Sequence, residues 1–398
     1  MTDQLRAGIV GSGWMALVHT EALRRIGVEV VGMVGSTPER ARAKAANPLL
    51  PPAVDSLDEL LAIPGLSAVH VTSPNHVHAE QAAAALRAGV PVVCEKPLGV
   101  DSAETGRLEA LAAETGLVNA VCFNLRHYPQ NQNAAALVAA GEIGDPRFVT
   151  GSYLQDWLLL DTDWNWRLDA SRQGSLRAVA DIGSHWLDLT RFVIGRRVTA
   201  VFADLHTFIT ERNRPVGEVE TFGASRVDRD AARVVEPMAS DDAAGLLLRF
   251  EGGARGTASI SQISAGRKNS TSWEIDGATS ALAWTSEDPD RLWWGHRGRP
   301  NEVVEKDAAT LTAVGAATAN LPGGHVEGYA DTFRAMFTAV YRDIAAGAPS
   351  ARPDYPTFAD GHDAVLVCEA VSASAARGTW AEVRREATTT TIQEEATR

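Results

Sequence analysis

Short apolar runs alternate with longer Ala-rich segments up to residue 123 of the chain. The apolar runs have the length of strands buried on both faces, and the Ala-rich segments carry apolar residues at helical spacing. Alternation of this kind predicts an α/β domain whose parallel sheet is covered by helices on both faces. The pattern predicts strands at 7–10, 28–34, 68–72, 91–94 and 118–123, and helices at 14–25, 38–46, 57–62, 78–88 and 102–115.

The pattern changes after residue 124. Strand-like runs then follow one another, separated by glycine-containing turns such as those at 251–253 and 276–277, which is typical of an antiparallel sheet. We therefore expect an α/β domain at 1–123 and an α+β domain with a large, open, mainly antiparallel sheet at 124–385. The Thr- and Glu-rich end at 386–398 is expected to be a flexible tail. The strand-like runs lie at 147–155, 198–209, 245–250, 254–263, 271–276 and 280–285, and helices are predicted at 131–140, 329–346 and 358–376.

The first predicted strand ends in a glycine-rich turn that opens the first helix. Its sequence, Gly-Ser-Gly-Trp-Met-Ala at 11–16, fits the fingerprint of dinucleotide-binding (Rossmann) domains and has the flanking strand and helix that the fingerprint requires. Gly11 allows the tight turn, and Gly13 allows the backbone to approach a pyrophosphate, which the helix N-terminus favours. The predicted cofactor contacts of this turn are Gly11, Ser12, Gly13, Trp14 and Met15.

The end of the second strand bears on the choice between NAD and NADP. A site for NAD usually has an acidic residue there, which binds the ribose 2′-hydroxyl. This chain has Ser36, Thr37 and Arg40 instead, which could accept a 2′-phosphate, whereas Glu39 could face either way. These residues favour NADP, but they exclude neither NAD nor NADP.

Five motifs follow one another along the chain. They are the glycine-rich turn with His19 behind it, Thr-Ser-Pro-Asn-His-Val-His at 72–78, Glu-Lys-Pro at 95–97, Phe-Asn-Leu-Arg at 123–126 and Asp-Ile-Gly-Ser-His at 181–185. With these motifs the chain resembles the Gfo/Idh/MocA family of sugar oxidoreductases as far as about residue 379. Motifs at 153–157, 166–167, 264–269 and 323–325 are similar to those of levoglucosan-dehydrogenase-like members. The resemblance implies NAD or NADP as the cofactor and a homodimer or homotetramer.

Lys96, Asp181 and His185 are the candidate catalytic residues. Lys96 follows a strand at the sheet edge where ligands bind, and Asp181 and His185 are close enough for one helical turn to place both at one cleft. A histidine has a pKa suited to accepting a hydroxyl proton. The resemblance implies that Lys96 contacts cofactor and substrate, that His185 is the general base and that Asp181 holds a sugar hydroxyl. From spacing alone, Lys96 could instead be an exposed loop residue, Asp181 a helix N-cap and His185 a packed core histidine.

Other residues of these motifs are expected at the cofactor or the substrate. Aromatic rings stack on sugars and arginine donates paired hydrogen bonds, which makes Trp166 and Arg167 candidates for both. His76 and His78 resemble a metal pair, but the family that the chain resembles uses no metal, so no metal is expected. The expected cofactor contacts are Ser73, Pro74, Asn75, His78, Glu95, Lys96, Asn124, Trp166 and Arg167. The expected substrate contacts are Arg126, Trp166, Arg167, Asp181, His185, Lys268 and His325.

The composition argues against several classes of protein. The 398 residues carry a net charge of −13, which disfavours general binding to nucleic acid or to an anionic membrane. Uninterrupted apolar runs stay below about 18 residues, so no membrane span is expected. The three cysteines are widely spaced, and the start of the chain lacks a signal-peptide pattern, so we expect a cytoplasmic protein.

Three functions are compatible with these residues. The leading one is an NAD(P)-dependent dehydrogenase that moves a hydride between the nicotinamide and a secondary hydroxyl of a sugar, a sugar derivative or a polyol. The alternative is an NAD-dependent glycosidase that acts by transient oxidation, elimination, water addition and re-reduction. A non-catalytic sugar sensor is disfavoured because Lys96 and His185 are both present. The expected partner is a small-molecule sugar or glycoside.

Overall fold

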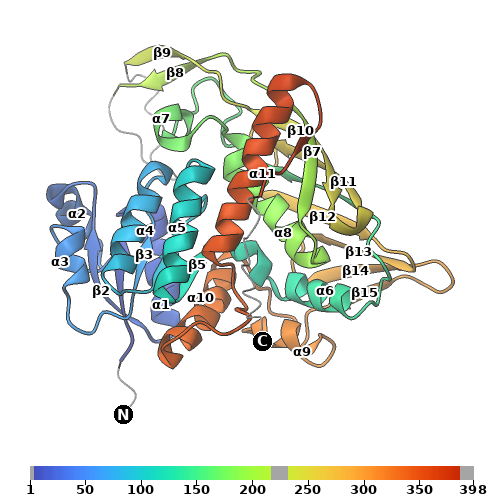
Figure 1. Cartoon of the computed structure of the whole chain (residues 1–398), viewed down its shortest axis with the longest axis horizontal. Helices are drawn as coiled ribbons and strands as arrows, with labels where there is room; N and C mark the ends of the chain where they lie inside the picture. The colour runs from blue at the N-terminus through green and yellow to red at the C-terminus, as the bar shows by residue number, and fades with distance from the viewer. Residues whose placement is uncertain (1–3, 217–231, 386–398) are drawn as a thin grey trace, which may run out of the picture.

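The computed structural model describes residues 4–216 and 232–385, so the predicted tail at 386–398 lies outside the described residues. Two large sheets with covering helices, and a two-stranded ribbon beside them, make up the described chain (Figure 1). Within these ranges, none of the helices is long and apolar enough to cross a membrane.

The first sheet has five parallel strands in the order β2-β1-β3-β4-β5. Every residue of β3 is buried, as expected of a strand with helices on both faces. The predicted α/β domain is therefore confirmed. Its strands are β1 (Arg6–Val10), β2 (Glu29–Val34), β3 (Ala68–Val71), β4 (Val92–Cys94) and β5 (Asn119–Val121), and its helices are α1 (Trp14–Arg25), α2 (Pro38–Lys44), α3 (Leu57–Leu61), α4 (His78–Arg87) and α5 (Ser102–Thr115).

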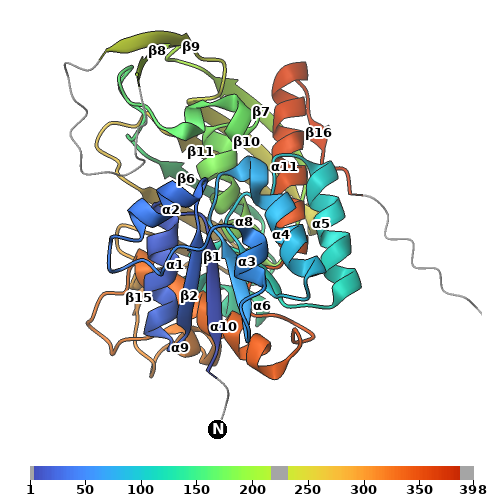
Figure 2. The ribbon, with the colours of Figure 1, turned by 90° about the vertical axis from the view of Figure 1, so that its left-hand side faces the viewer.

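A helix from the C-terminal part of the chain completes the cover of this sheet. α10 (Tyr329–Ala346) packs beside α1 (Figures 1 and 2). Its Phe333, Phe337 and Tyr341 share one buried cluster with Ile9 of β1. The core around the first sheet is thus assembled from both ends of the chain. The division of the chain into domains at residue 123 stays a prediction.

The second sheet has nine strands within the described ranges, in the order β15-β14-β13-β12-β6-β11-β10-β7-β16. Neighbouring strands are antiparallel except β6 and β11, which are parallel. β11 and β12 run in opposite directions and β6 lies between them, so β6 must be parallel to one of the two. The prediction of a large, mainly antiparallel sheet is confirmed. The strands are β6 (Phe148–Leu154), β7 (Val198–His206), β10 (Ala243–Phe250), β11 (Arg255–Ser261), β12 (Ser270–Asp276), β13 (Ser280–Thr285), β14 (Arg291–His296), β15 (Glu302–Glu305) and β16 (Ala381–Glu382).

Three helices cover one face of this sheet: α6 (Pro129–Ala139), α8 (Ser184–Ile194) and α11 (Phe358–Arg377) (Figure 1). Trp186 of α8 donates a hydrogen bond from Nε1 to the carbonyl oxygen of Ser272 in β12 at 2.9 Å. The indole nitrogen also lies over Gly151 of β6, where an added Cβ would come within 2.1 Å of that same carbonyl oxygen. Glycine at position 151 therefore lets α8 lie close to the sheet, which fixes the helix that carries His185.

Several elements of the second domain lack a clear sequence pattern and were not predicted. β8 (Glu211–Pro215) and β9 (Arg233–Pro237) form the two-stranded ribbon, and their sequences are largely polar. The run expected at 198–209 ends at His206. The edge strands β15 and β16, the adjacent strand β14, and the short helices α7 (Ala170–Gln173) and α9 (Ala313–Thr318) were also missed. Edge strands and short helices bury little apolar surface, so they leave weak periodicity in the sequence.

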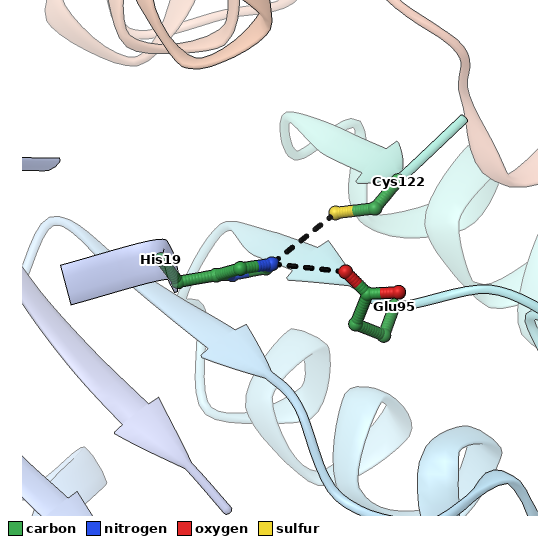
Figure 3. Close-up of side chains that lie close together, drawn as sticks. All are labelled: His19, Glu95 and Cys122. Carbon is green, nitrogen blue, oxygen red and sulfur yellow. Dashed lines mark hydrogen bonds and ion pairs between the residues drawn. The ribbon is translucent and has the colours of Figure 1, made fainter. Parts of the chain in front are cut away.

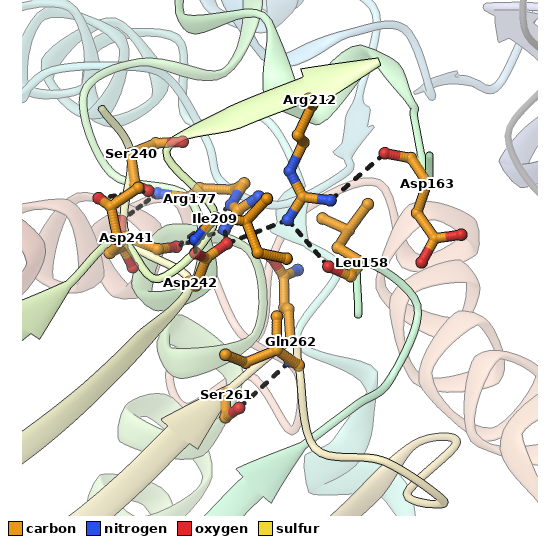
Figure 4. A network of polar contacts seen from close by, with 12 residues as sticks. Leu158, Asp163, Arg177, Ile209, Arg212, Ser240, Asp241, Asp242, Ser261 and Gln262 are labelled. Carbon is orange, nitrogen blue, oxygen red and sulfur yellow. Dashed lines mark hydrogen bonds and ion pairs between the residues drawn. The ribbon is translucent and has the colours of Figure 1, made fainter. Parts of the chain in front are cut away.

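A buried network of charged side chains ties the ribbon to the second sheet (Figure 4). The Asp242 carboxylate binds both Arg177 and Arg212, with 3.1 Å between Asp242 Oδ1 and the Arg212 guanidinium, and it accepts the backbone N–H of Ile209 at 2.7 Å. Arg212 also donates to the carbonyl oxygen of Leu158 at 2.8 Å. The network therefore holds the segment after β6, which leads into the candidate site.

We expect Asp242→Ala to destabilise the protein by about 3–5 kcal/mol, because it leaves two buried guanidinium groups without their carboxylate. Glu236→Ala is the matched control, since it removes the partner of Arg214 from a half-exposed ion pair on the same ribbon. Its expected effect is about 0–1 kcal/mol. Urea unfolding of both variants measures the difference, and equal effects would show that the network is not stabilising.

Candidate active site

A large cavity lies at the carboxyl ends of the first sheet's strands and is closed on its other side by the second domain. Its volume is about 1080 Å³. The first domain contributes the segments that follow β1, β2, β3 and β4. The second domain contributes β6, the single turn η3 (Trp166–Leu168), and the π turn η4 (Val179–Gly183) that runs into α8. Ligands of open α/β sheets bind at this edge.

The two glycines of the fingerprint have different roles in the structure. Gly11 has a φ of +116°, and an added Cβ would lie 2.5 Å from Thr72 Oγ1, so the turn itself requires glycine. A Cβ added to Gly13 meets none of the described heavy atoms within 4 Å. Gly13 is also the N-cap residue of α1 and has no capping side chain. The backbone at Gly13 and the helix N-terminus are therefore open to the cavity, as a bound pyrophosphate requires.

Some of the residues that follow β2 line the cavity and others do not. Ser36, Arg40 and Lys44 line the cavity, and the Arg40 guanidinium donates to Ser36 Oγ at 3.2 Å. Thr37 does not line it, because its side chain caps α2 by accepting the backbone N–H of Arg40. Glu39 is also outside the lining. This end of the cavity thus combines a hydroxyl with two basic side chains.

A buried carboxylate collects three donors at the centre of the cavity. Asp181 Oδ1 lies 2.9 Å from Lys96 Nζ and 3.0 Å from Arg167 Nε, and Asp181 Oδ2 accepts from Gln262 Nε2 at 2.9 Å. Lys96 Nζ also donates to the backbone carbonyl of Asp181 at 2.7 Å. Burial alone would raise the pKa of Asp181, but Arg167 and Lys96 hold it well below its ordinary range. Asp181 is therefore an ionised residue of the π turn and not a helix N-cap.

His185 faces the same cavity from the first turn of α8. Its ring contacts Phe123 edge-on with 5.7 Å between centroids, and its Nδ1 is buried without a hydrogen-bond partner among the described residues. Burial, together with the positive charge of Lys96, lowers the pKa of His185 well below 6.5. The imidazole is thus neutral near pH 7 and has an unprotonated nitrogen, which a general base needs.

Most of the predicted site residues come together in this cavity. Asn75 is held in place by a hydrogen bond to Gln173 at 2.9 Å, and His78 by hydrogen bonds to the carbonyl oxygens of Ser73 and Pro97. The predicted residues that line the cavity are Gly11, Ser12, Gly13, Trp14, Met15, Ser36, Arg40, Ser73, Pro74, Asn75, His78, Glu95, Lys96, Asn124, Trp166, Arg167, Asp181 and His185.

Three predicted substrate contacts lie elsewhere in this chain. Arg126 is buried behind the cavity, where its Nε donates to Asp188 at 2.7 Å. The Lys268 side chain is 79% exposed and pairs with Asp156 at 2.6 Å. His325 is exposed on the loop before α10. The sequence could not show these orientations, because Arg126 lies in a single helical turn and Lys268 in a bend, where side-chain direction depends on the packed fold. Asn269, next to Lys268, is the residue that lines the cavity.

The structure adds polar lining residues that the sequence analysis did not select. Tyr153 OH and Gln155 Nε2 both donate to Asn269 Oδ1, at 2.9 and 2.7 Å. Gln155 Oε1 is buried without a partner among the described residues, so it can receive a hydrogen bond from a ligand. Tyr153 and Gln155 are two residues apart on an extended segment and therefore share a face. That spacing was a usable signal, since both belong to the motif at 153–157.

His19, Glu95 and Cys122 form a buried cluster beside the cavity (Figure 3). Their ligand-type atoms lie within 4.8 Å of one another. His19 Nε2 is 3.0 Å from Glu95 Oε1 and 3.8 Å from Cys122 Sγ. Of the three, Glu95 alone lines the cavity among the described residues.

Comparisons with known proteins agree with this geometry. Residues 5–123 match the family model described as an oxidoreductase family with an NAD-binding Rossmann fold, and residues 131–283 match the GFO/IDH/MocA C-terminal domain. Levoglucosan dehydrogenase of Pseudarthrobacter phenanthrenivorans is 28% identical, over 96% of this chain and 98% of that protein.

Solved structures are similar over nearly the whole chain. An oxidoreductase domain protein from Kribbella flavida is 31% identical with a TM-score of 0.83, over 97% of this chain and 100% of that one. A levoglucosan dehydrogenase in complex with NADH and L-sorbose is 27% identical with a TM-score of 0.84, over 96% of this chain and 99% of that one. The predicted family, fold class and nicotinamide cofactor are confirmed. The chain belongs to the Gfo/Idh/MocA family of oxidoreductases, with an NAD-binding Rossmann domain at its N-terminus.

Proposed function

We propose that this protein is an NAD(P)-dependent dehydrogenase that oxidises, reversibly, a secondary hydroxyl of a sugar, a sugar derivative or a polyol. The observation that carries the proposal is the meeting of Lys96, Asp181 and His185 in one cavity with an open dinucleotide turn. A cation and a neutral imidazole at one point are suited to an alcohol, because the imidazole can take the hydroxyl proton while the cation stabilises the developing alkoxide.

The cofactor fits the residues that the structure presents. The turn at 11–16 and the N-terminus of α1 hold the pyrophosphate, and Pro74 and Asn75 lie at the next strand end along the cavity. When bound, the nicotinamide supplies the hydride chemistry. What remains for the protein is to position the sugar and to accept one proton from it, which are the tasks of Lys96, Asp181 and His185.

Each of the three central residues has a distinct role in this proposal. His185 accepts the hydroxyl proton, because its buried ring is neutral. Lys96 donates to the same oxygen as negative charge develops on it. Asp181 orients the Lys96 ammonium and the Arg167 guanidinium, since both its carboxylate oxygens are already engaged by protein donors. This differs from the expectation that Asp181 mainly holds a sugar hydroxyl.

Other lining residues of the cavity suit a sugar ring. The Arg167 guanidinium lies 4.7 Å from the centroid of the Trp166 ring, which presents an aromatic face next to a cation. Gln155 and Asn269 add amide groups that can both donate and accept. Solved relatives hold L-sorbose or levoglucosan, which supports a sugar as the substrate class.

The most useful experiment is a panel of sugars, polyols and glycosides with NAD and NADP, in which reduced cofactor and released aglycone are measured together. Net accumulation of reduced cofactor with a sugar or polyol supports the dehydrogenase. Aglycone release without net reduction would replace it with the NAD-dependent glycosidase. If no compound of the panel is turned over while the cofactor still binds, the non-catalytic sugar sensor is the function that remains.

Gly13→Val should weaken NAD(P) binding roughly tenfold or more, because the new side chain enters the space of the pyrophosphate. The chain should still fold, since no described atom lies within 4 Å of a Cβ at this position. Gly298→Val is the matched control, at a position that is equally open, exposed and outside the cavity lining. Cofactor titration measures both, and unchanged affinity in folded Gly13→Val would contradict the assignment of the turn.

We further propose that the protein prefers NADP, on the basis of Ser36, Arg40 and Lys44 at the end of the cavity next to β2. Ser36→Asp should shift the ratio of kcat/KM values towards NAD by about tenfold or more, because a carboxylate repels the 2′-phosphate and accepts from the ribose diol. Thr37→Asp is the control, since it adds the same charge at a helix cap outside the lining. Equal ratios in the two variants, or a native preference for NAD, would contradict the proposal.

Lys96→Met and His185→Ala should each reduce kcat about 10²–10⁴-fold while cofactor affinity stays nearly intact. The two losses should not add in the double variant, because both groups act on one hydroxyl. Protonation of His185 stops oxidation, and since its pKa is lowered, activity should be retained to below about pH 6.5 and fall only in more acidic solution.

His185→Ala should therefore flatten this acidic limb of the pH–rate profile. Lys268→Met and His325→Ala are the matched controls, because both residues lie outside the cavity. A near-native kcat and pH profile in His185→Ala would show that His185 is only a packed core residue.

A further inference from the structure

Four buried side chains from four separate elements form one hydrogen-bonded chain that ends at the cavity. Tyr341 OH of α10 lies 3.0 Å from His70 Nε2 of β3, and His70 Nδ1 lies 3.0 Å from His19 Nδ1 of α1. His19 Nε2 lies 3.0 Å from Glu95 Oε1, which follows β4. Of these four residues, Glu95 alone lines the cavity. The hydrogen-bonded series is thus buried inside the protein as far as Glu95, where it reaches the cavity.

The ionised Glu95 carboxylate fixes the first hydrogen bond of this series. It only accepts, so His19 Nε2 carries a hydrogen, and the orientation that sends every donor towards Glu95 leaves His19 Nδ1 bare. His70 then donates to that nitrogen from its own Nδ1, and burial lowers the pKa of His70, so its Nε2 is bare as well. Tyr341, whose buried hydroxyl stays protonated, supplies the last hydrogen. In this orientation all donors point towards the Glu95 carboxylate.

The surroundings hold the two imidazole rings in this arrangement. Phe337 meets His19 and His70 edge-on, with 5.0 and 4.7 Å between ring centroids. Tyr341 stacks on His70 at 5.9 Å. Glu95 Oε2 accepts the backbone N–H of Lys96 at 3.2 Å, so the carboxylate is anchored from the cavity side too. Buried polar chains in which every member is bonded restrict their members to one orientation.

We propose that Tyr341 and His70 are positioning residues that act through His19 to hold Glu95 as a carboxylate at the nicotinamide end of the cavity, so that the protein favours the oxidised over the reduced cofactor. The oxidised nicotinamide ring carries a positive charge and the reduced ring carries none, so a fixed carboxylate beside it discriminates between them. This inference rests on the proposed function for one point, the position of the nicotinamide next to Lys96.

The same atoms could be arranged to hold a metal ion, and the two arrangements exclude each other. A metal at His19, Glu95 and Cys122 (Figure 3) would need a bare His19 Nε2, whereas the donor chain needs a hydrogen there. Both nitrogens of His19 already have hydrogen-bond partners in the protein. The geometry therefore favours the donor chain over a metal site.

The test measures the dissociation constants of oxidised and reduced cofactor for the full chain without any sugar. Glu95→Gln should shift the ratio of the two constants about tenfold towards the reduced form, which corresponds to about 30 mV for a two-electron couple. Tyr341→Phe keeps the ring stacked on His70 and removes the hydroxyl, so it should shift the ratio in the same direction by about threefold. His70→Leu should have an effect between these two.

Tyr355→Phe is the matched control, because Tyr355 OH also makes a buried hydrogen bond, to Asp343 of the same helix, but is not linked to Glu95. Its ratio should equal that of the native protein. Equal changes of both constants in Tyr341→Phe, or an unchanged ratio in Glu95→Gln, would overturn the proposal. One equivalent of a transition metal in the purified protein, lost in Cys122→Ala, would overturn it as well. The ratio of the two dissociation constants is measured without sugar. If no sugar were a substrate, the proposed function would fail, but the ratio would still test the role of Glu95.

Discussion

The ion cluster around Asp181 is the interaction on which the site depends, because it joins the two domains across the cavity. Lys96 comes from the edge of the first sheet, whereas Asp181 and Arg167 come from the second domain. Each of these buried charges would be costly if it were left without its partners. The cluster is therefore complete only when the two domains are in contact, and the same contact brings the Lys96 ammonium to the cavity.

The position of Asp181 is set in turn by residues that never reach the cavity. The carboxylate of Asp241 accepts the backbone N–H groups of Arg177 and Val179, at 2.6 and 2.9 Å, and so fixes the start of the π turn. The close approach of Trp186 to Gly151 sets the height of α8 above the sheet. Because small displacements of reacting groups can cost about 10²-fold in rate, this remote packing bears directly on the residues that we propose to be catalytic.

The cavity holds two buried carboxylates in different electrostatic surroundings. Asp181 faces two cations, which hold its pKa low and make it a fixed anchor for both. For Glu95, burial raises the pKa, but the hydrogen bond from His19 and the positive charge of Lys96 outweigh it, and the group stays ionised. The negative charge of Asp181 is thus balanced by cations of the protein, whereas the charge of Glu95 can act on a positively charged ligand. The same residue type serves two roles because its neighbours differ.

The residues along the chain are enough to predict the first domain and to select the candidate residues of the site. Buried parallel strands are continuous apolar runs, and the fingerprint at 11–16 is local, so both are readable along the chain. Lys96, Asp181 and His185 were selected through the motifs that carry the family resemblance. Tertiary structure decided what each side chain faces. Arg126 and Lys268 point away from the cavity while Asn124 and Asn269 line it, and His70, Tyr341 and Glu95 meet only in the folded chain. Orientation and long-range partners depend on packing between elements far apart in sequence, and local periodicity carries no information about them.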